Sequence, residues 1–461
     1  MAEKVIIIGG GFAGLSAATA LAERGYRVIV LEGRQVLGGR AYSFADPQSG
    51  DAVDNGQHLF MGCYFETRAF LKRIGQEDAI HFQPSLSADF ADTQGGTARL
   101  RCWRLPAPWH LLSGLMRLSS LSWADRFRLL YMSRALRHAR THPDELGPLT
   151  VEQWLTRWNQ SERARHHLWD LIAIAALNED PAIASAAPFA AVLERAFFAG
   201  TENARLGFAT AGLSDLYVRA AGAFIEERGG EVRVKSPVES ILLRNDRIEG
   251  VRLREGSRLA ADWVISAVPA PALLKMLPEA AIAAEPVFQR MRRLRPAPII
   301  SFHLWFDRAI TRRAFVGLLD THVQWVFNKS AILSLPKGKE GYVSAVISGA
   351  HAFIDWPESK LLGMVLEELR RVFPKAREAA LVRSRVIKEH QATLSPAVGS
   401  EALRPAHPSP YRGLLLAGDW TKTGLPATIE SACLSGHACA RIVTQGKPSI
   451  DSQVLQETAH A

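Results

Sequence analysis

The residues best arranged for chemistry stand near the start of the chain, where three glycines are closely spaced: Gly9, Gly11 and Gly14. They follow the apolar, β-branched run Val5–Ile8 and precede a stretch rich in Ala and Leu, Leu15–Arg24. The first run is typical of a buried parallel strand and the second of a helix. Glycines at this spacing permit a tight turn and let the backbone approach a pyrophosphate at a helix N-terminus. The pattern therefore predicts a turn that binds the phosphates of a dinucleotide.

An acidic residue and a second glycine turn extend this prediction. The apolar strand Tyr26–Leu31 ends at Glu32, whose carboxylate suits a ribose diol and disfavours a ligand with a 2′-phosphate. The sequence Gly38-Gly39-Arg40 follows shortly afterwards. An NAD-binding unit does not require this second turn, whereas a longer dinucleotide such as FAD needs one more close approach of the backbone. We therefore expect FAD rather than NAD.

These motifs resemble the glutathione-reductase-type flavoproteins, in particular the amine oxidase and phytoene desaturase superfamily. The opening pattern of that superfamily, GxGxxGL followed by a strand-terminal Glu and by GGR, is matched residue for residue. The resemblance implies an α/β fold, with a glutathione-reductase-type FAD-binding Rossmann domain and an inserted, discontinuous α+β substrate domain. It also implies a set of FAD-binding residues in this part of the chain: Gly9, Gly11, Phe12, Ala13, Gly14, Glu32, Arg34, Gly38, Gly39, Arg40, Gly56, Gln57 and His58.

Two later segments fit the same domain. The runs Val238–Leu243 and Ile248–Leu253 flank a polar turn and predict a hairpin. In the resembled superfamily the residue that matches Val238 lines the adenine. Near the C-terminal end, a Leu-rich strand and the start of a helix place a carboxylate and a helix N-terminus where they suit a ribityl hydroxyl and the flavin ring. The residues expected to contact FAD there are Gly418, Asp419, Thr428 and Ile429.

The chain of 461 residues is long enough for two or three domains. The FAD-binding domain is predicted to be discontinuous, with segments 1–60, 208–274 and 400–445. The two insertions, 61–207 and 275–399, are rich in Leu, Phe and Trp, and we expect them to form the substrate domain. Residues 446–461 are expected to form a C-terminal tail.

The type of substrate is also suggested by resemblance. The amine oxidase branch has an aromatic residue at the position of Thr428, where it aligns an amine, so the threonine counts against amine oxidation. Several stretches instead resemble the squalene-associated FAD-dependent desaturases, which are understood to be hydroxysqualene dehydroxylases: Asp54–His58, Gly62–Tyr64, Ala107–His110, Ala176–Asn178 and Gln324–Phe327. This resemblance covers nearly the whole chain. It implies a hydrophobic isoprenoid substrate and the reductive removal of the allylic hydroxyl of hydroxysqualene to give squalene, in hopanoid and isoprenoid biosynthesis.

This reaction needs a proton donor, because hydroxide is a poor leaving group, and a dry pocket that protects an allylic cation from water. The candidate acids are His58, whose ordinary pKa is suitable, and Asp54. His58 is also suited to packing against the flavin, and Asp54 to fixing the backbone at Gly56. Gln57 and Asn178 are candidates for holding the hydroxyl by hydrogen bonds. The alternatives are a carotenoid (phytoene-type) desaturase or isomerase, and a flavin-bearing redox carrier.

The net charge of +9 is concentrated in one segment. Residues 99–140 contain nine arginines and one acidic residue, Asp125, for a net charge of +8. The arginines are interleaved with Trp, Leu, Phe and Met at helical spacing, which suits the interface of an anionic membrane surface. Because the excess positive charge is confined to this one segment, it argues against a nucleic-acid partner. A solvated basic face is the alternative interpretation.

The remaining features concern location and electron supply. The four cysteines form neither a CxxC pair nor a regular framework, so we expect no metal site and no disulfide scaffold. A leader peptide is not visible, and no apolar stretch reaches the roughly 20 residues of a spanning helix. We therefore expect a cytoplasmic, peripheral membrane-associated protein. A second GxGxxG motif after a strand is absent from the sequence, so the flavin should be reduced by an external reductant, either NADPH or a redox partner.

Overall fold

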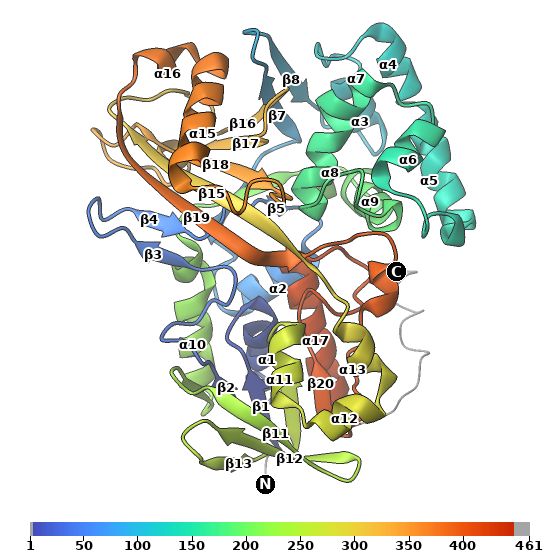
Figure 1. Cartoon of the computed structure of the whole chain (residues 1–461), viewed down its shortest axis with the longest axis vertical. Coiled ribbons are helices and arrows are strands. Elements are labelled where there is room, and N and C mark those ends of the chain that lie inside the picture. Colours follow the sequence, from blue (N-terminus) through green and yellow to red (C-terminus); the bar gives the residue numbers. More distant parts are fainter. Residues whose placement is uncertain (1–2, 447–461) are drawn as a thin grey trace.

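A five-stranded parallel sheet organises the lower half of the molecule as seen in Figure 1. The computed structural model describes residues 3–446. The strand order brings together segments that are far apart in the chain: β10 (Glu231–Arg233), β2 (Arg27–Leu31), β1 (Lys4–Ile8), β14 (Trp263–Ser266) and β20 (Leu414–Leu416). The central strand β1 is apolar because both of its faces are covered, as is usual for a parallel sheet.

Alternate residues of β1 enter two different cores. Val5 and Ile7 pack toward three helices: α1 (Phe12–Ala22), α10 (Arg219–Glu226) and α17 (Ile429–Gln445). Ile6 and Ile8 face the opposite side, which is covered by a small antiparallel sheet and further helices: β11 (Val238–Arg244), β12 (Arg247–Leu253), β13 (Arg258–Ala260), α11 (Ala270–Met276), α12 (Glu279–Ala284) and α13 (Pro286–Met291). The sheet is therefore the middle of three layers, which is the arrangement expected of a Rossmann-like domain.

A seven-stranded sheet forms the second large unit (Figure 1). Its order is β19 (Leu381–Leu394), β15 (Pro296–Phe306), β18 (Tyr342–Ser348), β17 (Trp325–Asn328), β16 (Phe315–Leu318), β7 (Ser87–Ala91) and β8 (Thr97–Arg101). One face packs against α15 (Glu358–Val372), whose buried Leu361, Val365, Leu369 and Val372 recur at helical spacing. The helices α14 (Lys329–Ile332) and α16 (Pro374–Glu378) complete this unit.

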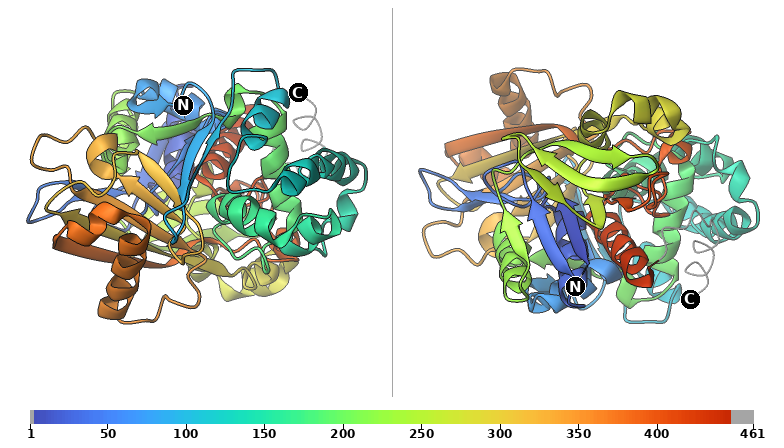
Figure 2. Two further views of the ribbon diagram at one scale, coloured as in Figure 1. Left: turned by 90° about the horizontal axis from the view of Figure 1, so that it is seen from above. Right: turned by 90° about the horizontal axis from the view of Figure 1, so that it is seen from below.

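A group of helices lies on the side of the molecule away from β15 and β19, as Figure 2 shows from above. Its members are α3 (Trp109–Leu115), α4 (Trp123–Arg128), α5 (Tyr131–Thr141), α6 (Val151–Arg157), α7 (Glu162–Ala164), α8 (Asp170–Leu177) and α9 (Ala186–Leu193). The predicted basic helical segment thus consists of three short helices, because Ser122 caps α4 and starts a new helix. Within residues 3–446, no helix is long and apolar enough to cross a membrane.

Short elements connect these units. They are α2 (Phe65–Arg73) and the strands β3 (Ser43–Ala45), β4 (Ala52–Asp54), β5 (Phe60–Met61), β6 (Ile80–Phe82) and β9 (Leu206–Ala209). The helix α2 contributes Phe70 and Leu71 to the core that also contains α1 and α17.

The predicted fold class is confirmed: a parallel Rossmann-like core is combined with a further sheet domain. The predicted domain boundaries differ from the packing at two places. Residues 65–73 belong to the core of the first domain although they were assigned to the insertion 61–207. Phe288 and Met291 share a core with β20, so the first domain continues past the predicted boundary at residue 274. The predicted tail 446–461 lies, apart from Gly446, outside the described residues.

Candidate functional site

A cavity of about 460 Å³ lies at the carboxyl ends of β1, β14 and β20, which is the edge where parallel sheets bind ligands. We call it the sheet cavity. Most of the residues predicted to bind FAD line it: Gly9, Gly11, Phe12, Ala13, Glu32, Arg34, Gly38, Gly39, Arg40, Gly56, Gln57, His58, Gly418, Asp419, Thr428 and Ile429. The two segments that contribute them, 1–60 and 400–445, are brought together by the parallel sheet.

The glycine turn has the geometry that a bound pyrophosphate needs. Gly9 has a φ of +105°, a conformation that other residues adopt only with strain. A side chain at Gly14 would overlap the carbonyl oxygen of Gly9, so glycine is required for α1 to begin this close to β1. Gly14 therefore serves the packing of helix on strand and does not line the cavity itself. The N-terminus of α1 faces the sheet cavity through Phe12 and Ala13.

Glu32 is held in a fixed position at the tip of β2. Its carboxylate accepts hydrogen bonds from the backbone N–H of Gly10 at 3.0 Å and of Arg34 at 2.9 Å, and the side chain is largely buried. This position suits a ribose diol. Val238 is not among the residues that line the cavity. Backbone hydrogen bonds from Lys235 and Ser236 to residues 34 and 32 place the start of β11 beside this acid, and the adenine contact of Val238 stays a prediction.

The far end of the sheet cavity is formed by the C-terminal segment. Asp419, at the tip of β20, forms an ion pair with Arg40, so the second glycine turn and the last strand are joined across the cavity. Thr428 caps α17, and its hydroxyl accepts a hydrogen bond from the backbone N–H of Ser431 at 3.2 Å. The N-terminus of this helix thus faces the cavity. The cavity offers polar groups to a ribityl chain and the positive end of a helix to an electron-rich flavin ring. Its residues therefore fit FAD.

The segment Asp54–His58 is placed beside the sheet cavity, but its polar side chains differ in role. The Asp54 carboxylate accepts hydrogen bonds from Lys329 Nζ at 2.8 Å and from the backbone N–H of Leu213 at 3.1 Å, and it does not line the cavity. This placement favours the positioning role over that of a general acid. Gln57 lines the cavity, accepts from Lys329 Nζ at 3.1 Å and donates to the His58 carbonyl at 3.2 Å.

The two other candidates from the sequence also line the sheet cavity. Burial lowers the pKa of His58, so its ring is neutral at pH 7. The Nε2 atom of His58 is buried and has no hydrogen-bond partner among residues 3–446. Asn178 ends α8 in the left-handed conformation, and its Oδ1 accepts a hydrogen bond from the Ser348 hydroxyl at 3.1 Å. His58 and Asn178 therefore lie where they can contact a ligand, and their catalytic roles stay predictions.

Sequence reasoning missed the network beneath this segment. His303 on β15 contacts the Asp54 carbonyl through Nε2 at 3.0 Å and the Tyr342 hydroxyl through Nδ1 at 2.7 Å. Burial lowers the pKa of His303 to about 4, so the ring is neutral and donates from Nε2 to the carbonyl. Lys329 and His303 are about 250 residues or more from Asp54 in the chain. No local pattern in the sequence connects them.

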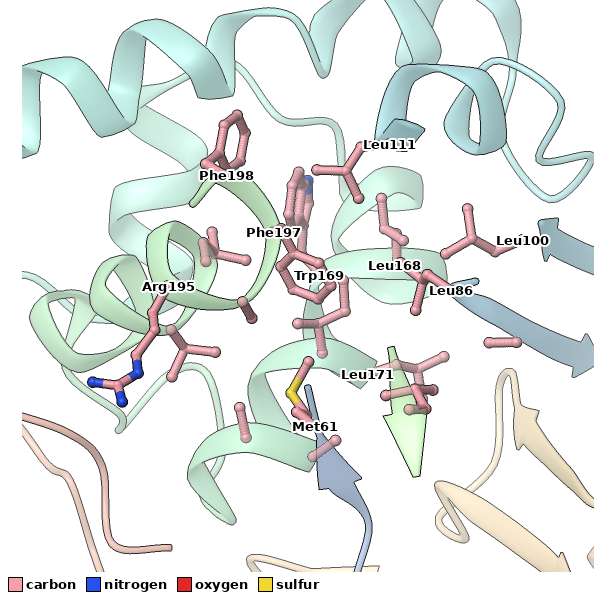
Figure 3. Close-up of a pocket in the computed structure, with 18 of the residues that line it drawn as sticks. Met61, Leu86, Leu100, Leu111, Leu168, Trp169, Leu171, Arg195, Phe197 and Phe198 are labelled. Carbon is pink, nitrogen blue, oxygen red and sulfur yellow. The ribbon is translucent and has the colours of Figure 1, made fainter. Parts of the chain in front are cut away.

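A second cavity of about 430 Å³, which we call the apolar cavity, lies among α3, α4, α5, α8 and α9 (Figure 3). Leucines, phenylalanines and tryptophans dominate its lining, among them Leu86, Leu100, Leu111, Leu168, Trp169, Leu171, Phe197 and Phe198. Five residues line both cavities: Leu59, Tyr64, Ala175, Trp325 and Thr428. The two cavities are therefore neighbours that share one wall.

One ion pair stands in the lining of the apolar cavity. Arg195 donates to Glu430 Oε1 at 3.1 Å. Burial raises the pKa of Glu430, and donors oppose this effect: the backbone N–H groups of Glu66 and Thr67, the Thr67 hydroxyl and Arg195 itself. The carboxylate is thus fully hydrogen-bonded and fixes Arg195 at the wall. Neither residue is among the site residues predicted from the sequence, because the ion pair joins positions 235 residues apart in the chain.

The chain resembles known proteins over nearly its whole length. The profile of the family described as flavin containing amine oxidoreductase matches residues 12–444. A 15-cis-phytoene desaturase from Synechococcus elongatus is 27% identical, with 95% of each chain covered. A hydroxysqualene dehydroxylase from Rhodopseudomonas palustris is 28% identical, with 96% of this chain and 99% of that protein covered.

Two solved structures share the fold. An oxidoreductase from Methanosarcina mazei superimposes with a TM-score of 0.77 at 19% identity, covering 95% of this chain and 100% of that one. Wild-type putrescine oxidase bound to putrescine gives a TM-score of 0.71 at 17% identity, covering 96% and 99%. The architecture around the sheet cavity is thus one that occurs in known oxidoreductases.

Proposed function

The chain belongs to the flavin-containing amine oxidoreductase family, and from this premise we propose that it removes the allylic hydroxyl of hydroxysqualene to give squalene. It is a flavin-containing oxidoreductase whose cofactor is FAD. The observation that carries the proposal is the apolar cavity, which shares a wall with the sheet cavity and is lined almost throughout by hydrocarbon side chains. A long isoprenoid fits such a lining, whereas a small polar amine does not.

Two further observations support this proposal. The hydroxysqualene dehydroxylase of R. palustris matches over 99% of its length. Thr428 stands where the resembled amine oxidases have an aromatic residue, and it caps α17. A threonine that serves as a helix cap leaves no aromatic wall for an amine at this position.

In this proposal, one group of residues binds the cofactor and another surrounds the substrate. FAD, when bound, would supply the electrons for the reductive removal of the hydroxyl. The glycine turns, Glu32 and the Arg40–Asp419 pair would hold the cofactor by its phosphates, ribose and ribityl chain. The apolar cavity would exclude water, which otherwise captures an allylic cation. An external reductant, either NADPH or a redox partner, is proposed to reduce FAD.

The second candidate is a carotenoid (phytoene-type) desaturase or isomerase, which is favoured by the 15-cis-phytoene desaturases that resemble this chain at similar identity. We propose to separate the two by anaerobic incubation of the reduced protein with hydroxysqualene. Squalene should appear. Formation of a longer polyene from phytoene by the oxidised protein, without conversion of hydroxysqualene, would favour the desaturase. Lack of lipid turnover despite bound, reducible FAD would favour a redox carrier.

We also propose that residues 99–140 dock on an anionic membrane surface, as a cytoplasmic, peripheral membrane-associated enzyme would. Seven of the thirteen large apolar side chains exposed in the described part of the chain lie in this segment: Trp103, Leu105, Trp109, Trp123, Phe127, Leu130 and Tyr131. Guanidinium groups lie over three of these rings, with Arg126 4.4 Å from the Trp123 ring centroid. Trp109 and Leu130 also line the apolar cavity, so the exposed patch reaches its wall.

A further inference from the structure

A run of arginines lies at the end of the helix α13 and in the turn that leads into β15. Four exposed arginines stand within six consecutive positions: Arg290, Arg292, Arg293 and Arg295. Residues 286–306 contain no Asp or Glu that could balance them. Arg292 donates to Glu279 Oε1 at 2.7 Å. The other three guanidinium groups have no hydrogen bond or ion pair within the described residues, and we call these three residues the arginine surface.

The arginine surface lies beside the sheet cavity, because β15 connects the two. Arg295 directly precedes this strand, and Ile299 on the strand lines the cavity. Four residues of extended chain, about 13 Å, separate them. The end of β19 lies alongside: the backbone N–H of Ser395 donates to the Arg295 carbonyl at 2.9 Å, and Thr393, two positions earlier, lines the cavity. A molecule that docks on this surface is therefore held close to the FAD site.

An exposed apolar side chain lies in the neighbouring loop. Val398 is 42% exposed and stands between the end of β19 and a short turn of 3₁₀ helix, Ser400–Leu403, that contacts α13. Protein interfaces combine charged groups with apolar contacts, and arginine is enriched in them. A free anion would use only the arginines. The combination of groups therefore favours an acidic protein as the partner.

The arginine surface differs from the segment 99–140, for which we propose a membrane. In that segment exposed aromatic rings accompany the arginines. The large apolar residues of α13, Phe288 and Met291, are instead buried in the core and cannot insert into a bilayer. Figure 1 shows α13 beside the parallel sheet and α4 at the opposite end of the molecule. The two basic surfaces are thus separate and suit different partners.

The proposed reaction consumes electrons that another molecule must supply. Removal of the hydroxyl, R–OH + 2 e⁻ + 2 H⁺ → R–H + H₂O, uses two electrons and two protons in each turnover. Only one GxGxxG motif follows a strand in the sequence, so no dedicated nicotinamide-binding domain is evident. A protein that carries an iron–sulfur cluster or a flavin can supply electrons, and an acidic one matches the arginine surface in charge.

We propose that the arginine surface docks a small acidic electron-transfer protein that reduces FAD. In each turnover the redox group of the partner, an iron–sulfur cluster or a flavin, gives up two electrons in total. The electrons pass to FAD together with two protons from water. The inference rests on the proposed function for the direction of electron flow. It deepens that function by identifying the class of reductant and the surface that receives it.

The test measures how fast an acidic, previously reduced two-iron ferredoxin bleaches the flavin absorbance of the FAD-loaded protein, without oxygen and without lipid. The rate constant for the wild-type protein should fall steeply as salt is added, because charges steer the encounter. The triple variant Arg290→Gln, Arg293→Gln, Arg295→Gln should react about tenfold more slowly or less at low salt. Its Kd for the oxidised ferredoxin, measured by calorimetry, should rise in parallel.

A second triple variant is the matched control. Arg312→Gln, Arg370→Gln, Arg371→Gln removes the same charge from exposed positions of the unit built on the seven-stranded sheet. This variant should react with ferredoxin and bind it as the wild-type protein does. None of the six arginines lines either cavity, so both variants should contain as much FAD as the wild-type protein.

Three results would overturn the docking site. The first is a wild-type rate that is negligible or does not depend on salt, and the second is an equal rate in both triple variants. The third is reduction by NADPH alone that is as fast as reduction by ferredoxin. The proposed function fails separately, because the assay contains no lipid. A protein that is reduced through this surface but forms no squalene keeps the docking site and loses the reaction. Formation of squalene with equal rates in both variants does the reverse.

Discussion

At the scale of single residues, Asp54 and Lys329 form an ion pair that is almost wholly shielded from solvent, with 8% and 2% of the side chains exposed. The pair also holds Gln57, through the second hydrogen bond of Lys329 Nζ. Removing two charges from water is costly, and the pair is stable because each charge compensates the other. Removing only one of the two charged residues therefore lowers the stability of the protein more than replacing both by apolar residues.

Replacement of Asp54 by Asn should lower stability by about 3 kcal/mol or more, because it leaves the Lys329 ammonium buried without a counter-charge. Denaturant unfolding would measure the loss. The double variant Asp54→Asn, Lys329→Met removes the unpaired charge and should recover part of it. A single variant as stable as the wild-type protein would contradict the assignment of a buried, charged lysine.

His303 predicts a dependence of stability on pH. Its pKa is about 4 in the folded protein and about 6.5 when unfolded. Between these values the unfolded chain binds a proton that the folded protein excludes, so the free energy of unfolding should fall as pH decreases from about 6.5 to about 4. The total for this residue is about 3 kcal/mol.

The variant His303→Asn should show a flatter pH dependence over this interval, measured by thermal unfolding at a series of pH values. His407, whose pKa is also lowered by burial to about 4, remains and should keep part of the slope. A slope unchanged in His303→Asn would show that His303 takes up its proton over the same pH range in the folded and the unfolded protein.

At the scale of elements, the start of α1 depends on Gly14. A methyl group there would overlap the Gly9 carbonyl oxygen and push the helix away from β1, which displaces the N-terminus that faces the sheet cavity. Gly14→Ala should therefore purify with much less FAD, measured by visible absorbance relative to protein. Gly222→Ala is a matched control, because Gly222 also lies in a helix and its new methyl group meets nothing within 4 Å. Equal flavin content in both variants would contradict this account.

Elements with strong local patterns were predictable from the sequence. The hairpin β11–β12 and the strands β1, β2 and β20 lie where apolar runs and turn residues placed them. The helix α1 begins at Phe12, three residues before the predicted start, because the glycine turn itself forms its first turn. The boundaries of the insertions were less predictable, since the packing of α2, α12 and α13 on the first domain is a long-range property.

The residues of the candidate site also fall into two groups, those that a local motif predicts and those that only the folded structure brings together. The FAD-binding residues follow from motifs, each of which is complete within a few positions. Arg195 and Lys329 reach the site through contacts with Glu430 and Asp54, which lie more than two hundred positions away in the chain. No local spacing in the sequence predicts these contacts. The ion pair of Asp54 with Lys329 also joins residues that the sequence does not place side by side.

At the scale of the whole molecule, the proposed membrane surface and the parallel sheet lie at opposite ends (Figure 1). Replacing Arg126, Arg134 and Arg137 by Gln should weaken binding to anionic liposomes more than about tenfold at low salt, since each arginine contributes about 1 kcal/mol. Co-sedimentation with the liposomes would measure this loss of binding. A control with Arg219, Arg244 and Arg247 replaced removes the same charge from α10 and the β11–β12 hairpin and should bind as the wild-type protein does. Equal binding of both triple variants would refute the docking surface.

The parallel sheet combines strands that are far apart in the chain, and this affects folding during synthesis. The strand β1 leaves the ribosome well before β20 and α17, which complete its domain, because about 400 residues separate them in the chain. At about 5–20 residues per second, the apolar β1 waits roughly 20 to 80 seconds for them. During that interval Val5–Ile8 lacks part of its native cover and is open to capture by chaperones. Translation speed and chaperone supply, rather than intrinsic stability alone, should therefore govern how much of this protein is recovered in soluble form.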